Sequence, residues 1–283
     1  MRRGFGWSHL WSVALVCLAL GVTACSGSDT GGTPSAAAND VTFVATEYAF
    51  SGPDTIAAGW TTIHLRNDGK ELHHLGLMKL DEGKTMADVE ALMASGADAP
   101  DFIQFFGGPN AVIGPIEGAA TVNLEEGNYV ALCVIPGADG VPHAAKGMMK
   151  AITVSGQGGA SAPVADMTVE LADFTFVHDA PFSAGKHTIE VTNTAKQPHE
   201  IVIVKLDPGK TAADFVGAFA PGAPPGPPPG TPMGGLSPIA PGQVAYFDTD
   251  LVPGNYAAIC FLDDAASQKI HAELGMMEEF TIK

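Results

Sequence analysis

The sequence predicts an all-β protein that consists of two tandem Greek-key β-sandwiches, each with a short inserted helix. Two observations lead to this fold class. The second half of the chain repeats the first half at an offset of about 126 residues, and both halves contain short runs of alternating β-branched and apolar residues separated by Gly and Asn. Short strands with this punctuation are typical of sandwiches, and 283 residues are enough for two domains of ordinary size.

The repeat is most regular in its first part, where the two copies align without a gap. The matching residues, each 126 positions apart, are Phe50 and Phe176, Gly59 and Gly185, Ile63 and Ile189, and Asn67 and Asn193. Strands are expected in the alternating segments 61–65 and 75–78, and in their counterparts 187–191 and 201–204. The two halves are therefore expected to begin with the same strands.

One helix is expected in each copy after these strands. Thr85 with Asp88, and Thr211 with Asp214, have the spacing of a capping box before an apolar run. The copies then diverge, and the Pro-rich segment 220–232 of the second copy is expected to be an extended loop, because Pro disfavours both helix and strand pairing.

The N-terminus predicts export. Residues 1–24 combine a basic start, a short apolar run and small residues, which is the signature of a signal peptide. The segment Val22-Thr-Ala-Cys25 resembles a bacterial lipoprotein signal, in which the cysteine becomes the lipidated first residue. The alternative is an ordinary cleavage site near Ala24. We therefore expect a protein that is anchored to a bacterial membrane through lipid on Cys25, in the periplasm or at the cell surface.

Composition divides the rest of the chain. Residues 25–40 are rich in Gly, Ser, Thr and Ala and predict a flexible tether, and residues 155–165 predict a linker of the same kind. These boundaries predict two domains, at 41–154 and 166–283. The formal net charge of the chain is −17, and a surface this acidic disfavours nucleic acid and favours cations or a basic protein partner.

Four residues of metal-ligand type recur in the same order in the two copies. His73, Cys133, His143 and Met148 of the first copy return as His199, Cys260, His271 and Met276, at offsets of 126, 127, 128 and 128. One thiolate, one thioether and two imidazoles form the soft ligand set that selects copper. The sequence therefore predicts up to two copper ions, one in each domain.

The cysteines also have two plainer interpretations than a metal site. Exported cysteines often pair, so one alternative is a disulfide between Cys133 and Cys260, which we disfavour because each cysteine has the same position in its own repeat. A second alternative is that the cysteines are small buried hydrophobes and that Met148 and Met276 fill the core. The preserved order and spacing of all four residue types favours the metal site.

Each copy resembles the cupredoxins, the blue copper proteins. The resemblance covers about residues 41–154 and 166–283. Its motifs are Gly127-Asn-Tyr-Val-Ala-Leu-Cys133 and Gly254-Asn-Tyr-Ala-Ala-Ile-Cys260, each followed by a loop to His and, after four further residues, by Met. The resemblance implies cupredoxin-like sandwiches in which Cys and the two His are the equatorial ligands, Met148 or Met276 is the axial ligand, and the copper serves one-electron transfer.

One position departs from the cupredoxin pattern. The family usually has Asn after the first His ligand, where its side chain ties the two ligand loops together, and this chain has His74 and Glu200 instead. Because imidazole and carboxylate groups also bind metals, His74 and Glu200 are possible alternative ligands beside His73 and His199.

The function predicted from these residues is that of an exported, lipid-anchored copper-binding protein of the cell envelope, acting in one-electron transfer or copper handling. The alternative is a metal-free pair of cupredoxin-like domains that serves as a binding or scaffold module. A copper oxidoreductase is less favoured, because the tandem copper enzymes place a His beside the Cys, where this chain has Leu132 and Ile259.

Overall fold

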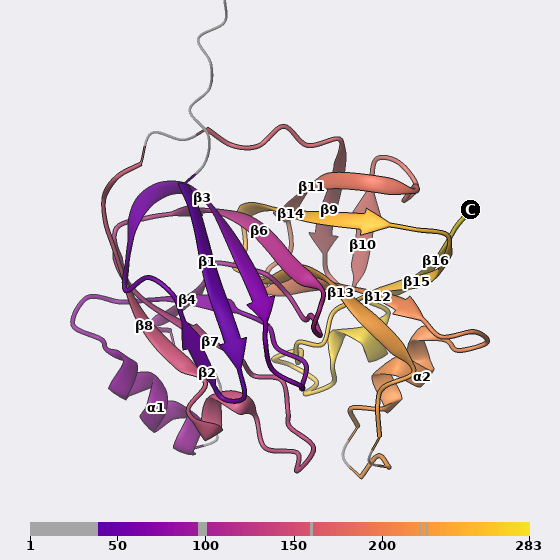
Figure 1. Cartoon of the computed structure of the whole chain (residues 1–283), viewed down its shortest axis with the longest axis horizontal. Helices are drawn as coiled ribbons and strands as arrows, with labels where there is room; N and C mark the ends of the chain where they lie inside the picture. The colour runs from indigo at the N-terminus through magenta and orange to yellow at the C-terminus, as the bar shows by residue number, and fades with distance from the viewer. Residues whose placement is uncertain (1–38, 96–100, 159–160, 221, 225) are drawn as a thin grey trace, which may run out of the picture. The chain divides into compact units, whose positions relative to one another are not determined.

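The helices and strands follow one another in the same order in both repeats (Figure 1). The computed structural model describes residues 39–95, 101–158, 161–220, 222–224 and 226–283, and these residues belong to one compact unit. The predicted lipoprotein signal and Cys25 lie outside the described residues. Every element of the first repeat has a counterpart in the second, so the repeat seen in the sequence is also a repeat in three dimensions.

The bounds of the elements are as follows. The first repeat contains β1 (Asn39–Thr46), β2 (Ala49–Ser51), β3 (Thr55–Asn67), β4 (Gly76–Leu80), α1 (Met86–Ser95), β5 (Ile103–Phe105), β6 (Glu117–Leu124), β7 (Gly127–Leu132), the 3-10 helix η1 (His143–Lys146) and β8 (Met149–Gln157). The second repeat contains β9 (Met167–Ala172), β10 (Thr175–His178), β11 (Gly185–Asn193), β12 (His199–Leu206), α2 (Ala212–Gly217), β13 (Gly230–Ile239), β14 (Val244–Leu251), β15 (Gly254–Ile259), the 3-10 helix η2 (His271–Leu274) and β16 (Met277–Ile282).

Each repeat has two layers of strands. In the second repeat the orders are β10-β9-β11-β14 and β13-β12-β15-β16. In the first repeat the same two layers are joined by β3, whose first part from Thr55 pairs with β8 and whose second part from Gly59 pairs with β6. Gly59 has φ +106° at this change of partner, a conformation that favours glycine. The predicted all-β class, with a sandwich in each half, is confirmed.

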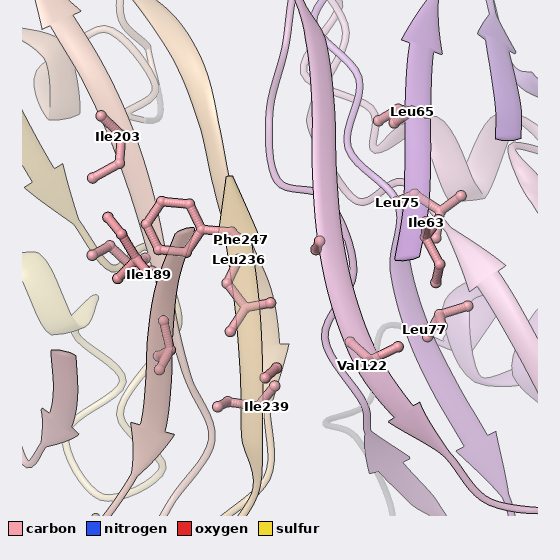
Figure 2. Packing of buried hydrophobic residues seen from close by; sticks show 14 of the residues in the cluster. Ile63, Leu65, Leu75, Leu77, Val122, Ile189, Ile203, Leu236, Ile239 and Phe247 are labelled. Atoms are coloured by element: carbon pink, nitrogen blue, oxygen red, sulfur yellow. The ribbon is translucent and has the colours of Figure 1, made fainter. Parts of the chain in front are cut away.

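The main core is continuous between the repeats. One cluster of buried apolar side chains takes residues from both layers of both repeats, and Figure 2 shows part of it, including Ile63 and Val122 from the first repeat and Ile189 and Phe247 from the second. Burying one such side chain stabilises the fold by about 1.5–3 kcal/mol. Because the cluster also contains Cys133 and other ligand-type residues, the candidate metal ligands lie inside the core.

Two sets of hydrogen bonds join the repeats. Strand β6 pairs antiparallel with β14, so one sheet runs through both halves of the chain. In addition, residues 106–112 run antiparallel to residues 233–239, a contact that we call the central pairing. In it, Gly107 N donates to Pro238 O and Ser237 N donates to Gly108 O, each at 2.8 Å.

Two glycines allow this close approach. A Cβ atom on Gly108 would lie 2.2 Å from Leu75 O, and a Cβ atom on Gly235 would lie 2.1 Å from Ile201 O. Both glycines also have φ +122°. Any larger residue would separate the central pairing from β4 and β12, so glycine is required here for steric reasons as well as for its backbone conformation.

The two helices begin where the sequence predicts. Asp88 accepts hydrogen bonds from Thr85 N and Thr85 Oγ1, and Thr211 with Asp214 forms a full capping box at the start of α2. The Pro-rich segment of the second repeat ends earlier than expected, because β13 begins at Gly230 and includes Pro232. Strand β13 is the outer strand of its four-stranded sheet, and Pro232 precedes the residues that enter the central pairing, a position where a strand tolerates Pro.

The domain boundaries stay predictions. Strand β1 begins at Asn39 and β8 continues to Gln157, so regular structure extends slightly into the predicted tether and linker. Among the described residues, none of the helices has the length and hydropathy needed to cross a membrane.

Candidate metal centres

The first ligand group, His73, Cys133, His143 and Met148, is gathered from four places in the first repeat. His73 precedes β4 and exchanges two backbone hydrogen bonds with Val112, while Cys133 follows β7. His143 begins η1, and Met148 immediately precedes β8. The ligand atoms of His73, Cys133 and His143 lie within 4.8 Å of one another, and Cys133 Sγ is 3.5 Å from His143 Nδ1.

The second ligand group, His199, Cys260, His271 and Met276, repeats this arrangement. His199 begins β12, Cys260 follows β15, His271 begins η2 and Met276 precedes β16. The ligand atoms of the two His and the Cys again lie within 4.8 Å of one another. Cys260 Sγ is 3.3 Å from His271 Nδ1 and 3.9 Å from His199 Nδ1. All eight side chains of the two groups are fully buried.

Backbone hydrogen bonds close each loop between Cys and Met. In the first repeat, Cys133 N donates to Met148 O at 3.2 Å, and Met148 N donates to His143 O at 3.0 Å. The same two bonds form at 3.1 and 2.9 Å around Cys260 and Met276. The positions of Cys, His and Met are therefore fixed by backbone contacts, and these contacts involve no metal.

Four nitrogen atoms of the buried imidazoles lack a hydrogen-bond partner in the described part of the chain, although His199 Nε2 lies 3.8 Å from Asp173 Oδ1. His73 Nδ1 and Nε2, His199 Nε2 and His271 Nε2 have no hydrogen-bond partner among the described residues. Burial lowers the pKa of His73 and of His199 to about 4, with a further contribution from His143 and His271 respectively. Burial also lowers the pKa of His271. A buried polar atom without a partner is costly, and a metal ion bound by neutral His73 would satisfy one of its two nitrogens. In the second group it is Nδ1 of His199 and of His271 that faces Cys260 Sγ and could bind the metal, so Nε2 of these rings would gain nothing from it.

The buried thiols also fit a cation. Burial raises the pKa of Cys133 to about 12 and also raises the pKa of Cys260. Each sulfur nevertheless receives a backbone N–H from the residue after the first His, which is His74 at 3.5 Å in the first repeat and Glu200 in the second. These donors favour the thiolate, and a bound cation would supply the remaining compensation. Both cysteines are free, which excludes the disulfide alternative.

His74 and Glu200 have partners other than the ligand groups. His74 Nε2 accepts a hydrogen bond from Val134 N at 2.9 Å, and Glu200 Oε1 accepts one from Phe261 N at 3.0 Å. Each side chain therefore ties the segment of the first His to the residue after Cys. The resemblance assigns this task to Asn in the cupredoxins, and here a different side chain performs it in each repeat.

The surroundings of the second His differ between the repeats. His143 Nε2 is 2.8 Å from Glu71 Oε2, and the ring of Tyr48 covers His143 at 5.1 Å between centroids. In the second repeat, Phe174 covers His271 at 5.2 Å, and Gln197 stands at the position of Glu71. The sequence interpretation missed these residues, although the offset of 126 that relates the first ligands also relates Tyr48 to Phe174 and Glu71 to Gln197.

Asn110 was also missed. It lies in the central pairing, 1% exposed, and contacts residues that follow the first His of both repeats. The segment looked divergent in the sequence, but Gly107-Gly108 and Gly234-Gly235 are 127 residues apart, and this spacing aligns Asn110 with Ser237. The Gly-Gly pair was the signal that identifies the central pairing.

Comparison with known proteins yields weak similarities. No family model matches the chain, and no curated protein is significantly similar to it. Solved structures that resemble parts of the chain include auracyanin from Roseiflexus castenholzii, with 22% identity over 41% of this chain and 94% of that chain and a TM-score of 0.29. Auracyanin A, a "blue" copper protein from Chloroflexus aurantiacus, has 20% identity over 41% of this chain and 100% of that chain, with a TM-score of 0.29.

A longer match is the copper nitrite reductase of Nitrosomonas europaea, with 14% identity over 86% of this chain and 93% of that chain and a TM-score of 0.25. With TM-scores below 0.5, these likenesses carry no argument about function.

Proposed function

We propose that this chain is a copper-binding protein with one site in each repeat, and that it acts in one-electron transfer. The observation that supports this most directly is the pair of buried His-Cys-His groups, in which the ligand atoms lie within 4.8 Å of one another and every side chain is fully buried. Two imidazoles, a thiolate and a neighbouring Met form a ligand set that prefers copper to harder metals.

The chain's own residues prepare each site. Backbone bonds hold Cys133 beside Met148 and Cys260 beside Met276, and burial excludes water from the ligand atoms. Bound copper would supply a one-electron redox couple. Rigid ligands inside a packed core limit the rearrangement that accompanies a change of charge, which suits a carrier of electrons better than a catalyst that must admit a substrate.

Metal analysis of the purified mature protein tests copper binding. We expect two copper ions per chain and a blue absorption band after addition of Cu(II), one ion in Cys133→Ser or Cys260→Ser, and neither metal nor band in the double variant. His187→Gln is a matched control, because His187 binds Asp166 outside both ligand groups. Zinc instead of copper, or no metal at all, would contradict the proposal, and the second result would favour a metal-free scaffold.

Electrochemistry separates electron transfer from copper handling. A carrier should cycle between its oxidised and reduced forms at a stable potential and keep its metal throughout. A protein that stores copper should instead hold Cu(I) tightly and show no reversible wave. Retention of Cu(I) without redox cycling would support the two copper sites but contradict a role in electron transfer.

The same proposal places the protein in the cell envelope, anchored by lipid on Cys25 to a bacterial membrane. Its support is the sequence of residues 1–25, and the net charge of −17 suggests a basic redox or copper-handling protein as the partner. Cell fractionation tests the anchor: the protein should be in the membrane fraction, and Cys25→Ser should move it to the soluble fraction. If wild type and Cys25→Ser were distributed in the same way between the membrane and soluble fractions, the lipid anchor would be rejected.

A further inference from the structure

Asn110 lies between the two side chains that follow the first His ligands. Its amide nitrogen donates to Glu200 Oε2 at 2.9 Å and to Leu236 O at 3.0 Å. Its side chain is also a neighbour of His74 and raises the pKa of that ring, against the larger effect of burial. One residue of the first repeat thus contacts the equivalent position in both repeats.

His74 and Glu200 extend this contact to both cysteine loops. His74 Nε2 accepts from Val134 N, the residue after Cys133, and Glu200 Oε1 accepts from Phe261 N, the residue after Cys260. Because His74 Nε2 is an acceptor, the ring proton of its neutral form is on Nδ1, which is the nitrogen that can donate to Asn110. Hydrogen bonds from Val134 to His74, from Asn110 to Glu200 and from Phe261 to Glu200, together with the contact between His74 and Asn110, therefore connect the two cysteine loops.

The three side chains that form this connection are buried, and Asn110 is the one that contacts both of the others. His74, Asn110 and Glu200 are 5%, 1% and 6% exposed, so water does not compete effectively for these bonds. The position equivalent to Asn110 in the second repeat is Ser237, whose hydroxyl donates to Pro109 O at 3.2 Å. The link between His74 and Glu200 consequently depends on Asn110 and has no symmetric duplicate in the central pairing.

We propose that Asn110 is a positioning residue that couples the two copper sites, through His74 to the loop of Cys133 and through Glu200 to the loop of Cys260. This inference rests on the proposed copper function. Metal bound by Cys133 would constrain the adjacent Val134 amide and its bond to His74. That constraint reaches Phe261 through Asn110 and Glu200, and the reverse effect must be of equal size because thermodynamic coupling is reciprocal.

Nuclear magnetic resonance of the mature Cys260→Ser protein tests this path, because only the first site can then bind. Addition of Cu(I) should shift the backbone amide signals of Val134 and Phe261. In Cys260→Ser with Asn110→Ser, which introduces the residue of the equivalent position, the Val134 signal should still shift and the Phe261 signal should not. Ser237→Ala is the matched control, since it changes the same pairing and should preserve both shifts.

The outcomes separate the two proposals. Absence of Cu(I) binding and of a Val134 shift would overturn the copper function and the coupling together. A Val134 shift without a Phe261 shift, or a Phe261 shift that persists in Asn110→Ser, would overturn the coupling alone. Glu200→Gln gives a second test if Asn110→Ser does not fold, because Gln has one acceptor oxygen and cannot receive both Phe261 N and Asn110 in the observed geometry.

Copper affinity gives an independent measurement in the chain with both cysteines. Filling the first site should change the affinity of the second by about 5-fold or more, the lower end of typical coupling between sites. In Asn110→Ser the two affinities should become independent of each other, while Ser237→Ala should keep the coupling. Equal coupling in wild type and Asn110→Ser would reject the role of Asn110.

Discussion

The imidazoles of the two ligand groups lie in the core, where the charged form of His is unfavourable. On unfolding, His73 and His199 return from a pKa of about 4 to the ordinary value of 6.5. Between these two pH values the unfolded chain binds more protons than the folded chain, so the metal-free protein loses stability as the pH falls from 6.5 towards 4. The stability that neutral His contributes is fully present only above pH 6.5.

A His73→Gln variant should isolate this contribution. Each pKa unit corresponds to about 1.4 kcal/mol, so the free energy of unfolding of wild type should fall relative to the variant by at most about 3 kcal/mol between pH 6.5 and pH 4. Urea unfolding of the metal-free proteins at several pH values measures the difference, and His187→Gln serves as a surface control. A difference that does not change with pH would contradict a neutral, buried His73.

Metal binding should release protons in a fixed number. In the Cys133→Ser protein, which keeps the second ligand group, the pKa of Cys260 is raised while the pKa values of His199 and His271 are lowered. At pH 7 the thiol is therefore protonated and these imidazoles are neutral, so one proton should leave per copper bound. Calorimetry in buffers with different ionisation enthalpies measures the number of protons released per copper ion. Release of two protons would contradict neutral imidazoles in the metal-free protein.

At the scale of residues, the sequence predicted candidate ligands that the structure brings together as two His-Cys-His groups, but it did not predict their neighbours. His73, Cys133 and the other ligand-type residues could be identified because residue type, order and spacing recur in both halves. Asn110 has no such mark, since an Asn in a loop is common and its partner Glu200 lies 90 residues away. Hydrogen bonds between distant segments follow from the packing of strands, which local sequence patterns do not specify.

At the scale of elements, the Gly-Gly pairs decide how the two halves meet. Gly108 and Gly235 bring the central pairing against the backbone of β4 and β12, closer than any side chain permits. Strands β4 and β12 carry the first His ligands at or just before their starts. The separation of the central pairing from these strands therefore affects both ligand groups.

Gly108→Ala should destabilise the protein strongly. A left-handed backbone costs a non-Gly residue about 1–2 kcal/mol, and overpacking adds about 1–3 kcal/mol, so we expect a loss of about 2–5 kcal/mol in the free energy of unfolding. Gly242→Ala is the matched control, because Gly242 has φ +79° and nothing lies within 4 Å of its added Cβ. Denaturant unfolding measures the loss in the free energy of unfolding for both variants, and the difference between them is the steric contribution at Gly108. Equal losses in the two variants would contradict a steric requirement for glycine at position 108.

Strands and helices were predictable where a periodic pattern exists. Alternation of apolar residues and the capping residues Thr85 and Thr211 placed the early strands and both helices. The segment after each helix has Gly and Pro in place of alternation, so its pairing with the other repeat gave no periodic signal. The extension of β13 through Pro232 was missed for a related reason: a Pro is compatible with an edge strand, and the edge is known only from the whole sheet.

At the scale of the whole molecule, the repeats share a sheet and a core. The ring of Trp60 in β3 packs on Tyr246 in β14 at 5.3 Å between centroids, so it lies across the junction of the repeats. Cooperative unfolding is expected when each part buries the apolar surface of the other. We therefore expect the two repeats to unfold as one unit.

Unfolding in denaturant should show a single transition with two probes. Trp60 is the only Trp after residue 11 and reports the junction, while circular dichroism reports the strands of both repeats. The two curves should coincide in midpoint and slope in the metal-free mature protein. An earlier transition in fluorescence than in circular dichroism would show that the junction opens first and that each repeat is stable alone.

The pairing of β6 with β14 also bears on the history of the chain. In a single repeat, β6 would be an exposed edge, and two copies of an ancestral repeat could cover this edge by pairing as a two-fold dimer. Duplication and fusion of the gene would convert that dimer into one polypeptide. Identical subunits must carry the same residue at equivalent positions, so the differences between His74 and Glu200 and between Asn110 and Ser237 require two copies of the repeat that are encoded separately.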